Sequence, residues 1–295
     1  MKKILLTMVG GLALAASAQQ VTVVSNARLL NGVEGPAYYP VLSSTGNQLL
    51  FASGEAYGLK LYDFNDNVVT RISDEKGAGI DAKFNAAGDV YYVTQRVSDN
   101  RLVYRTGMRY DHATAKSEVV LEAQHGYVRP EVGTRDNGFR GAKKSLAAKA
   151  GGTSVCVQGS VLYITTGGVT KEYTPVPSYA GYLWPSLSPD GKKVAFFAAG
   201  KGIVVTDLQG KVLAMLGKYE MPCWYSNDYL VAQNATDDGH QFTSSQIMLI
   251  KADGSFKTHL TSATSMAMQP TSAAGKIVYT TIDGLLYQMT INITE

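Results

Sequence analysis

The sequence predicts an all-β fold, a six-bladed β-propeller of four-stranded antiparallel blades, and three observations support this prediction. Short apolar segments recur along the whole chain, separated by Gly, Asp and Asn turn residues, and almost none has helical periodicity. A motif that usually contains Pro begins each of six copies, near residues 40, 82, 130, 185, 222 and 270. Their spacing of roughly 37 to 55 residues, with four strands per copy, is typical of propeller blades.

The fourth copy is the most regular and defines the repeat. Residues 184–191 (WPSLSPDG) precede an apolar segment, residues 192–198 (KKVAFFA). Pro presets φ and Gly accepts a positive φ, so the Pro-Asp-Gly sequence favours a tight turn between two strands. Further strands are expected at residues 202–208 and 211–216, which completes one four-stranded antiparallel unit.

The other copies are less regular, and the third is the least regular of all. The expected strands are residues 48–52, 59–64 and 68–72 in the first copy, 90–94, 101–106 and 118–121 in the second, 153–157, 161–165 and 170–173 in the third, 229–233, 246–251 and 257–260 in the fifth, and 276–281 and 285–290 in the sixth. The third copy contains a polar, basic insertion with Arg135, Arg140, Lys143, Lys144 and Lys149. Charged residues in a long loop are usually solvated, and an acidic docking partner is the alternative.

The N-terminal segment provides the strand that the sixth copy lacks. Residues 21–30 form a spare strand, and the last copy supplies only three. Pairing the spare strand with the outer edge of the last blade closes the ring and covers an edge that would otherwise favour aggregation. We therefore expect residues 19–295 to form a single propeller domain.

The residues of the fourth copy, WPSLSPDGKKVAF, resemble the repeat of the TolB-like (WD40-like repeat) six-bladed propeller family. The resemblance covers nearly all of the chain as a repeat pattern. It implies a periplasmic protein-interaction platform, or a domain that gates a separate hydrolase. The chain is expected to lack both the additional N-terminal α/β domain of TolB and a hydrolase domain, so the partners of TolB are not transferred to it.

The N-terminus resembles a secretory signal peptide over residues 1–18. Lys2 and Lys3 precede an apolar run, and Ala16-Ser17-Ala18 is a small-residue cleavage site. No Cys follows this site, so no lipid anchor is expected, and no later run approaches the roughly 20 apolar residues of a membrane span. We expect a periplasmic or secreted monomer that is not embedded in a membrane. Without Lys2 and Lys3 the formal charge falls from +3 to +1, which gives no general attraction to nucleic acid.

No known catalytic or metal-binding pattern is found in the sequence. There is no Gly-x-Ser-x-Gly nucleophile motif, and residues 234–239 match only the first half of a calcium loop, because Ser245 occupies the twelfth position. We therefore expect no catalytic residues, no metal and no cofactor, and two free thiols at Cys156 and Cys223. None of the histidines has a second ligand at metal-binding spacing; they are His112, His125, His240 and His259.

The best candidate site comes from the repeat itself. Each blade's first strand lines the central channel of a propeller, so residues that precede the repeat's Pro position should surround one channel mouth. These residues are Tyr39, Asp81, Arg129, Trp184, Met221 and Gln269. Aromatic side chains offer apolar contact area and Arg offers a planar fork for a carboxylate, a mixture that suits a peptide or a small polar ligand. The alternative is that they are ordinary residues around a water-filled tunnel.

The sequence thus favours a non-enzymatic exported scaffold that binds a protein or peptide partner through the channel mouth. A carbohydrate-active enzyme, either a polysaccharide lyase or a hydrolase, is one alternative, with Asp81 and Arg129 as its acid–base and charge-stabilising groups. A sensor of a small molecule is another alternative, and it would be stabilised by its ligand through mass action.

Overall fold

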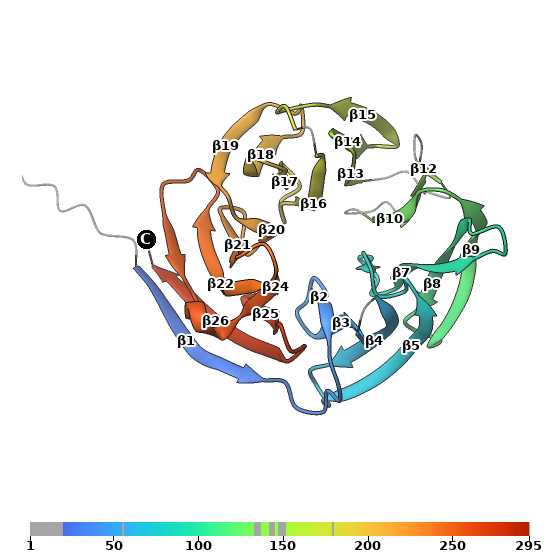
Figure 1. Ribbon diagram of the computed structural model, residues 1–295, viewed down its shortest axis with the longest axis horizontal. Helices are drawn as coiled ribbons and strands as arrows, with labels where there is room; N and C mark the ends of the chain where they lie inside the picture. The colour runs from blue at the N-terminus through green and yellow to red at the C-terminus, as the bar shows by residue number, and fades with distance from the viewer. Residues whose placement is uncertain are drawn as a thin grey trace, which may run out of the picture.

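The structure is a computed structural model that describes residues 20–54, 56–132, 137–141, 145–146, 152–178 and 180–294. The expected signal peptide, residues 1–18, lies outside them. The described chain is almost entirely β-strand, with a single 3-10 helix at Ala263–Ser265, and the strands surround a central axis (Figure 1). A membrane-crossing helix, long and apolar, is not found in these ranges. The all-β propeller class is confirmed.

The described strands form seven antiparallel sheets, numbered here in chain order. Sheet 1 contains β2 (Tyr38–Leu42), β3 (Gln48–Ala52), β4 (Tyr57–Asp63) and β5 (Val68–Lys76), and sheet 2 contains β6 (Lys83–Phe84), β7 (Val90–Val97), β8 (Val103–Asp111) and β9 (Lys116–His125). Sheet 3 contains β10 (Val128–Val132), β11 (Asn137–Gly141) and β12 (Ser145–Leu146), and sheet 4 contains β13 (Thr153–Gln158), β14 (Val161–Thr166) and β15 (Val169–Tyr173).

The second half of the chain is more regular. Sheet 5 contains β16 (Tyr182–Leu187), β17 (Lys193–Ala198), β18 (Gly202–Asp207) and β19 (Val212–Gly217), and sheet 6 contains β20 (Glu220–Trp224), β21 (Tyr229–Asp237), β22 (Phe242–Lys251) and β23 (Lys257–His259). Sheet 7 contains β24 (Ala267–Ala273), β25 (Lys276–Thr281), β26 (Leu286–Thr294) and, at its outer edge, β1 (Gln20–Leu29).

All six expected copies are present in the described chain, and the third of them forms two three-stranded sheets, so that seven sheets surround the axis. The segment that the sequence assigns to a basic insertion contains β11, which pairs with β10 from Val128↔Gly141 to Val132↔Asn137. Phe139 of β11 is fully buried against Tyr91 of sheet 2, which explains why this segment is a strand. β13–β15 then form a sheet of their own.

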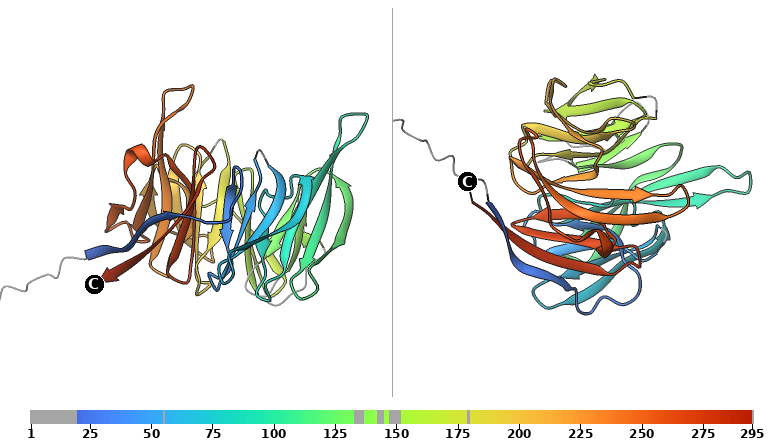
Figure 2. Two further views of the ribbon diagram at one scale, coloured as in Figure 1. Left: turned by 90° about the horizontal axis from the view of Figure 1, so that it is seen from below. Right: turned by 60° about the vertical axis from the view of Figure 1, so that its left-hand side comes forward.

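The ring is closed as predicted, by the N-terminal strand. β1 pairs antiparallel with β26, from Gln20↔Thr294 to Leu29↔Tyr287. The Ser25 and Thr290 hydroxyls, 265 positions apart in sequence, lie 2.9 Å from each other. Figure 1 and Figure 2 show β1 running along the outside of the last sheet. The outer edge of β26 is therefore covered.

The core consists of clusters between neighbouring sheets. Six of the seven neighbouring pairs in the described chain pack through apolar clusters, for example Leu162 and Phe196 between sheets 4 and 5. Sheets 3 and 4 instead meet through Arg140 and Glu131, whose side chains are 1% and 2% exposed. Arg140 was expected in a solvated loop, and this expectation is wrong because its strand pairs with β10 and its guanidinium binds Glu131. The remaining charged residues of the expected insertion, Arg135, Lys143, Lys144 and Lys149, lie outside the described residues.

One glycine is required by the close approach of two strands. Gly202 begins β18 with a φ of +92°, and a Cβ there would lie 1.9 Å from the Gly217 carbonyl oxygen of β19. Any other residue would be strained both by its backbone and by this backbone contact.

Candidate functional site

Five of the six expected channel-mouth residues share an unusual backbone conformation. They have positive φ angles although none is glycine: Tyr39 (54°), Asp81 (56°), Trp184 (51°), Met221 (51°) and Gln269 (52°). In sheets 1, 5, 6 and 7 the ladder between the first two strands is interrupted at this residue, as from Tyr38↔Ala52 to Val41↔Leu50. Such a bulge redirects a side chain out of the regular strand pattern. We call this end of the molecule the mouth face.

Arg129 is the exception among the six residues. It lies in a regular ladder opposite Arg140, without a bulge. Its Nε lies 3.2 Å from Oδ2 of Asp81, and the two side chains are 40% and 33% exposed. Burial alone would lower the pKa of Arg129, but the charge of Asp81 opposes this effect. Together with smaller contributions from Tyr127 and Cys156, it outweighs burial and raises the pKa of Arg129. The mouth therefore contains an ion pair that solvent and ligands can reach.

Tyr127 supports this arginine and was missed by the sequence analysis. The Arg129 guanidinium carbon lies 5.3 Å from the centre of the Tyr127 ring, and the Tyr127 hydroxyl donates to the Val157 carbonyl at 3.0 Å. Burial raises the pKa of Tyr127, so the phenol stays neutral. Residues two apart on an extended chain face the same side, and this spacing could have identified Tyr127.

A central cavity of about 250 Å³ lies on the axis of the ring, and all seven inner strands contribute to it. Three of the six expected residues line it: Asp81, Arg129 and Trp184. Five prolines of the repeat also line it, namely Pro40, Pro130, Pro185, Pro222 and Pro270.

Cys156 and Cys223 line the same cavity. Both are free thiols, as predicted, with Cys156 buried and Cys223 partly exposed. Burial raises the pKa of each thiol, which keeps both in the less reactive protonated form.

Tyr39 and Gln269 line a different pocket, of about 470 Å³, between sheets 1 and 7. The Tyr39 N–H donates to Oε1 of Gln269 at 2.6 Å, and the Gln269 N–H donates to Oε1 of Gln233 at 3.0 Å. Apolar and aromatic side chains dominate the rest of its lining, including Tyr38 and Ile282. Met221 lines neither this pocket nor the central cavity. Five of the six expected residues are thus divided between these two hollows.

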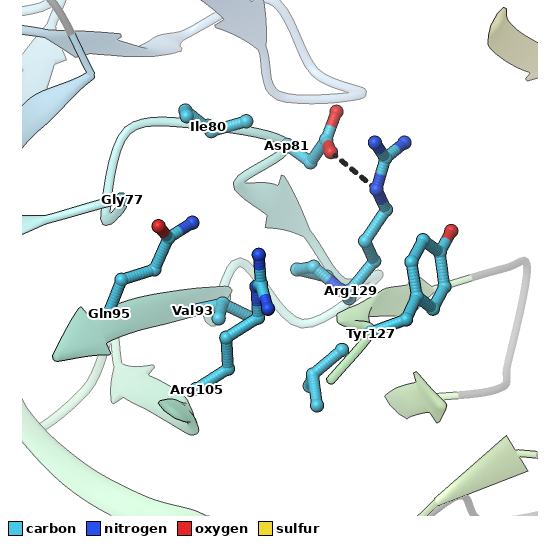
Figure 3. Close-up of a pocket in the computed structure, with 10 residues that line it drawn as sticks. Gly77, Ile80, Asp81, Val93, Gln95, Arg105, Tyr127 and Arg129 are labelled. Carbon is cyan, nitrogen blue, oxygen red and sulfur yellow. Dashed lines mark ion pairs between the residues drawn. The ribbon is translucent and has the colours of Figure 1, made fainter. Parts of the chain in front are cut away.

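A third and smaller pocket, of about 190 Å³, opens on the mouth face between sheets 2 and 3. Asp81 and Arg129 line it from one side, and Gln95 and Arg105, which the sequence analysis did not identify, line it from the other (Figure 3). Gln95 and Arg105 are partners across the β7–β8 ladder. In Figure 3 the polar ends of Gln95, Arg105 and Arg129 point toward the same side of the pocket.

Two long hairpins rise from the mouth face, on either side of sheets 7 and 1 (Figure 2). The β7–β8 ladder continues to Val97↔Val103, and the β21–β22 ladder continues to Asp237↔Phe242. The first hairpin ends in two exposed arginines, Arg96 and Arg101, with Asp99 between them. The second hairpin carries exposed acidic residues at its tip.

This second tip contains the sequence that resembles half a calcium loop. Asp237 accepts a hydrogen bond from the Gly239 N–H, and Asp238 accepts from the N–H groups of His240 and Gln241, each at 2.9 Å. The two carboxylates therefore stabilise a turn. Within the described ranges, no group of three or more His, Cys, Asp or Glu side chains has a geometry that could hold a metal ion.

The fold is similar to several solved propellers at low sequence identity. No family model and no curated protein matches the sequence. The structure resembles TolB from Acinetobacter baumannii (TM-score 0.50, 17% identity, covering 77% of this chain and 55% of that one). It also resembles oligogalacturonate lyase from Vibrio parahaemolyticus (TM-score 0.57, 10% identity, 92% and 96% covered) and the RRP9 WD40 repeats (TM-score 0.60, 7% identity, 93% and 100% covered). The chain therefore spans about half of TolB, and at these identities the similarity shows the propeller fold alone.

Proposed function

We propose that this chain is an exported, non-enzymatic scaffold that binds a protein or peptide segment on its mouth face. One observation carries the proposal: residues of the mouth face line all three hollows described above, and a raised hairpin stands on each side of sheets 7 and 1. An extended segment lying between the hairpins would pass over the pocket that Tyr39 lines. Binding sites in proteins are concave, mostly apolar and supplied with a few polar groups, as this face is.

The charges on the two hairpins favour an elongated partner. The β7–β8 tip carries Arg96, Arg101 and Asp99, a net positive charge, and the β21–β22 tip carries Asp237 and Asp238, all of them exposed. Opposite charges at the two ends of a binding surface favour one orientation of a charged segment. Because these charges are exposed, they contribute more to orientation and association rate than to affinity.

The test is recovery of a partner from the native cell-envelope and secreted fractions. Immobilised wild-type protein is compared with the Arg129→Ala/Trp184→Ala variant, which removes one of two cations and the large aromatic side chain of the central cavity. We expect partners captured by the wild type to be lost, or reduced about tenfold or more, since central Arg and Trp residues typically dominate binding energy.

A matched double variant, Gln209→Ala/Lys211→Ala, is the control. Both residues are exposed in the β18–β19 turn, far from the mouth residues along their blade. Unfolding midpoints establish that every variant is folded. Equal recovery by the wild type and the Arg129→Ala/Trp184→Ala variant would contradict the proposal. So would turnover of glycans or peptides that is abolished by Asp81→Ala or Arg129→Ala.

A further inference from the structure

The pocket between sheets 2 and 3 combines a small concave shape with an excess of positive charge. Its lining comes from β7 and β8 on one side, and from β10 and the segment before β6 on the other. Three of its side chains are charged: Asp81, Arg105 and Arg129. Two cations and one anion leave the pocket with one positive charge that the described residues do not neutralise.

The two arginines have free donors. Arg129 uses Nε for Asp81, and its Nη1 and Nη2 have no hydrogen-bond partner within the described ranges. Arg105 donates from Nη1 to the Gly126 carbonyl at 2.5 Å, and it has no ion-pair partner among the residues described. The contact with Gly126 fixes the Arg105 guanidinium and leaves its other nitrogens available. A guanidinium presents these donors as a planar fork that matches a carboxylate.

The remaining lining limits what can accompany the carboxylate. Val93 and Val128 are each 4% exposed and, with Ile80 and Pro130, form an apolar surface below the polar groups. The volume of about 190 Å³ equals roughly six waters at about 30 Å³ each. It therefore accommodates a carboxylate with a short aliphatic group, and is smaller than the roughly 300–1,000 Å³ of sites for larger ligands.

We propose that this pocket recognises a carboxylate that carries a short aliphatic group, and that Arg105 and Arg129 bind the carboxylate together. Gln95 adds an amide donor at the same side of the pocket, and the Tyr127 ring holds the Arg129 guanidinium in place. The inference extends the proposed function, because it names the chemical group that the mouth face would recognise in its partner. The same chemistry is offered by a free organic acid and by the terminal carboxylate of a peptide.

The test measures binding of three probes to the purified chain by ligand-observed NMR titration. The probes are acetyl-Gly-Gly-Val as the free acid, the same peptide as its C-terminal amide, and isovalerate. We expect the peptide acid to bind about tenfold or more tightly than the amide, the effect of losing one charge-assisted hydrogen bond. Equal binding of acid and amide would overturn the proposal.

Variants assign the effect to the pocket. Arg105→Gln and Arg129→Gln should each weaken binding of the peptide acid by about tenfold or more. Arg71→Gln is the charge-matched control, because Arg71 lies on β5 with its side chain 69% exposed. Weakening by Arg71→Gln as large as by Arg105→Gln would indicate general attraction and would overturn the proposal.

The outcomes separate this inference from the proposed function. Isovalerate binding as tight as the peptide acid supports recognition of a free acid, and tighter peptide binding supports recognition of a chain terminus. One combination of results contradicts the inference alone and leaves the proposed scaffold intact. In it, the partner is lost in Arg129→Ala/Trp184→Ala and retained in Arg105→Gln, and the peptide acid and the peptide amide bind equally. Acid-specific binding without any captured partner contradicts the proposed scaffold and supports the inference.

Discussion

At the residue scale, the left-handed backbone of the mouth residues is the most unusual local feature. Tyr39, Trp184, Met221 and Gln269 each precede a proline, a position that disfavours the right-handed helical conformation. A left-handed residue other than glycine costs about 1–2 kcal/mol. Surrounding contacts, such as the hydrogen bond from the Tyr39 N–H to Gln269, offset part of this cost. The repeat therefore presents a side chain at the mouth in blade after blade.

This regularity explains how much of the site could be predicted from the sequence. The residue before each proline can be found by aligning the copies, and Asp81 occupies the same left-handed position without a proline. The contact between Asp81 and Arg129 joins different blades and depends on how the blades pack, so no local pattern indicates it. Arg105 and Gln95 were missed for the same reason, since they reach the pocket from the second and third strands of their sheet.

A second residue-scale feature is the cluster around Arg109 in sheet 2. Its Nε and Nη2 lie 3.0 and 2.8 Å from Oδ2 of Asp89, and it also pairs with Asp111 and Glu118. Burial alone would raise the pKa of Asp89, but hydrogen bonds from the His112 N–H and from Arg109 outweigh burial and lower it. Folding therefore stabilises the charged form of this carboxylate.

This lowered pKa predicts a dependence of stability on pH. The contribution of Asp89 is fully present above the unfolded pKa of about 3.9 and is lost as pH falls through the lower folded pKa. We expect Asp89→Asn to be about 1–3 kcal/mol less stable than wild type at pH 7, with the difference narrowing toward pH 3. Urea unfolding at several pH values measures this difference. The control is Asp74→Asn, which removes an exposed ion pair with Arg71 and should have nearly the same free energy of unfolding as wild type at every pH. A stability difference between Asp89→Asn and wild type that does not change with pH would contradict the prediction.

At the element scale, the boundary between sheets 3 and 4 differs from every other boundary in the described ring. Nη2 of Arg140 lies 2.9 Å from Oε1 of Glu131, which also accepts from Ser154 and Thr165. The Arg140 guanidinium carbon lies 4.8 Å from the centre of the Tyr163 ring. Nε and Nη1 of Arg140 have no hydrogen-bond partner in the described part of the chain. Buried polar groups replace the apolar contacts that join the other sheets.

The sequence could not indicate this arrangement. A basic residue among other basic residues usually lies in solvent, and only the pairing of β11 with β10 places Arg140 inside. The short strands β11 and β12 lack the apolar runs of the other copies, so the third copy was predicted as one sheet with an insertion. Where the copies repeat the pattern of the fourth, as in sheets 1, 5 and 6, the strands were predicted correctly to within a few residues.

The polar boundary predicts an asymmetric response to substitution. Glu131→Gln leaves the Arg140 charge buried without its counter-charge, which should cost about 3–5 kcal/mol. Adding Arg140→Met removes that charge and should restore a substantial part of the lost stability. Urea unfolding of the wild type, Glu131→Gln, Arg140→Met and the double variant measures the four free energies of unfolding. A double variant as unstable as the sum of its single variants would contradict this account, because the two residues would then act independently.

At the scale of the whole molecule, ring closure depends on a single edge strand. Ile291 and Met289 of β26 are 4% and 3% exposed, and they lie in the strand that β1 covers. Without β1, the backbone groups at the outer edge of β26 would be unpaired, and an unpaired edge readily pairs with another chain.

Removal of β1 should therefore lower stability and cause self-association. The comparison is between chains that begin at residue 19 and at residue 30. We expect the shorter chain to unfold at a lower urea concentration and to elute from size-exclusion chromatography as concentration-dependent oligomers. A monomer with an unchanged unfolding midpoint would show that closure by β1 contributes little.

The pairing of β1 with β26 also determines when the molecule can finish folding. During synthesis, residues 20–29 leave the ribosome long before their partners, residues 287–294, which are made about 265 positions later. Each sheet of local hairpins can form as it is made, but the closing contact must wait for the last strand. Contacts between distant parts of a chain form slowly because loop closure costs entropy before any contact offsets it. The order of synthesis thus leaves β1 without its partner strand until almost the whole ring has been made.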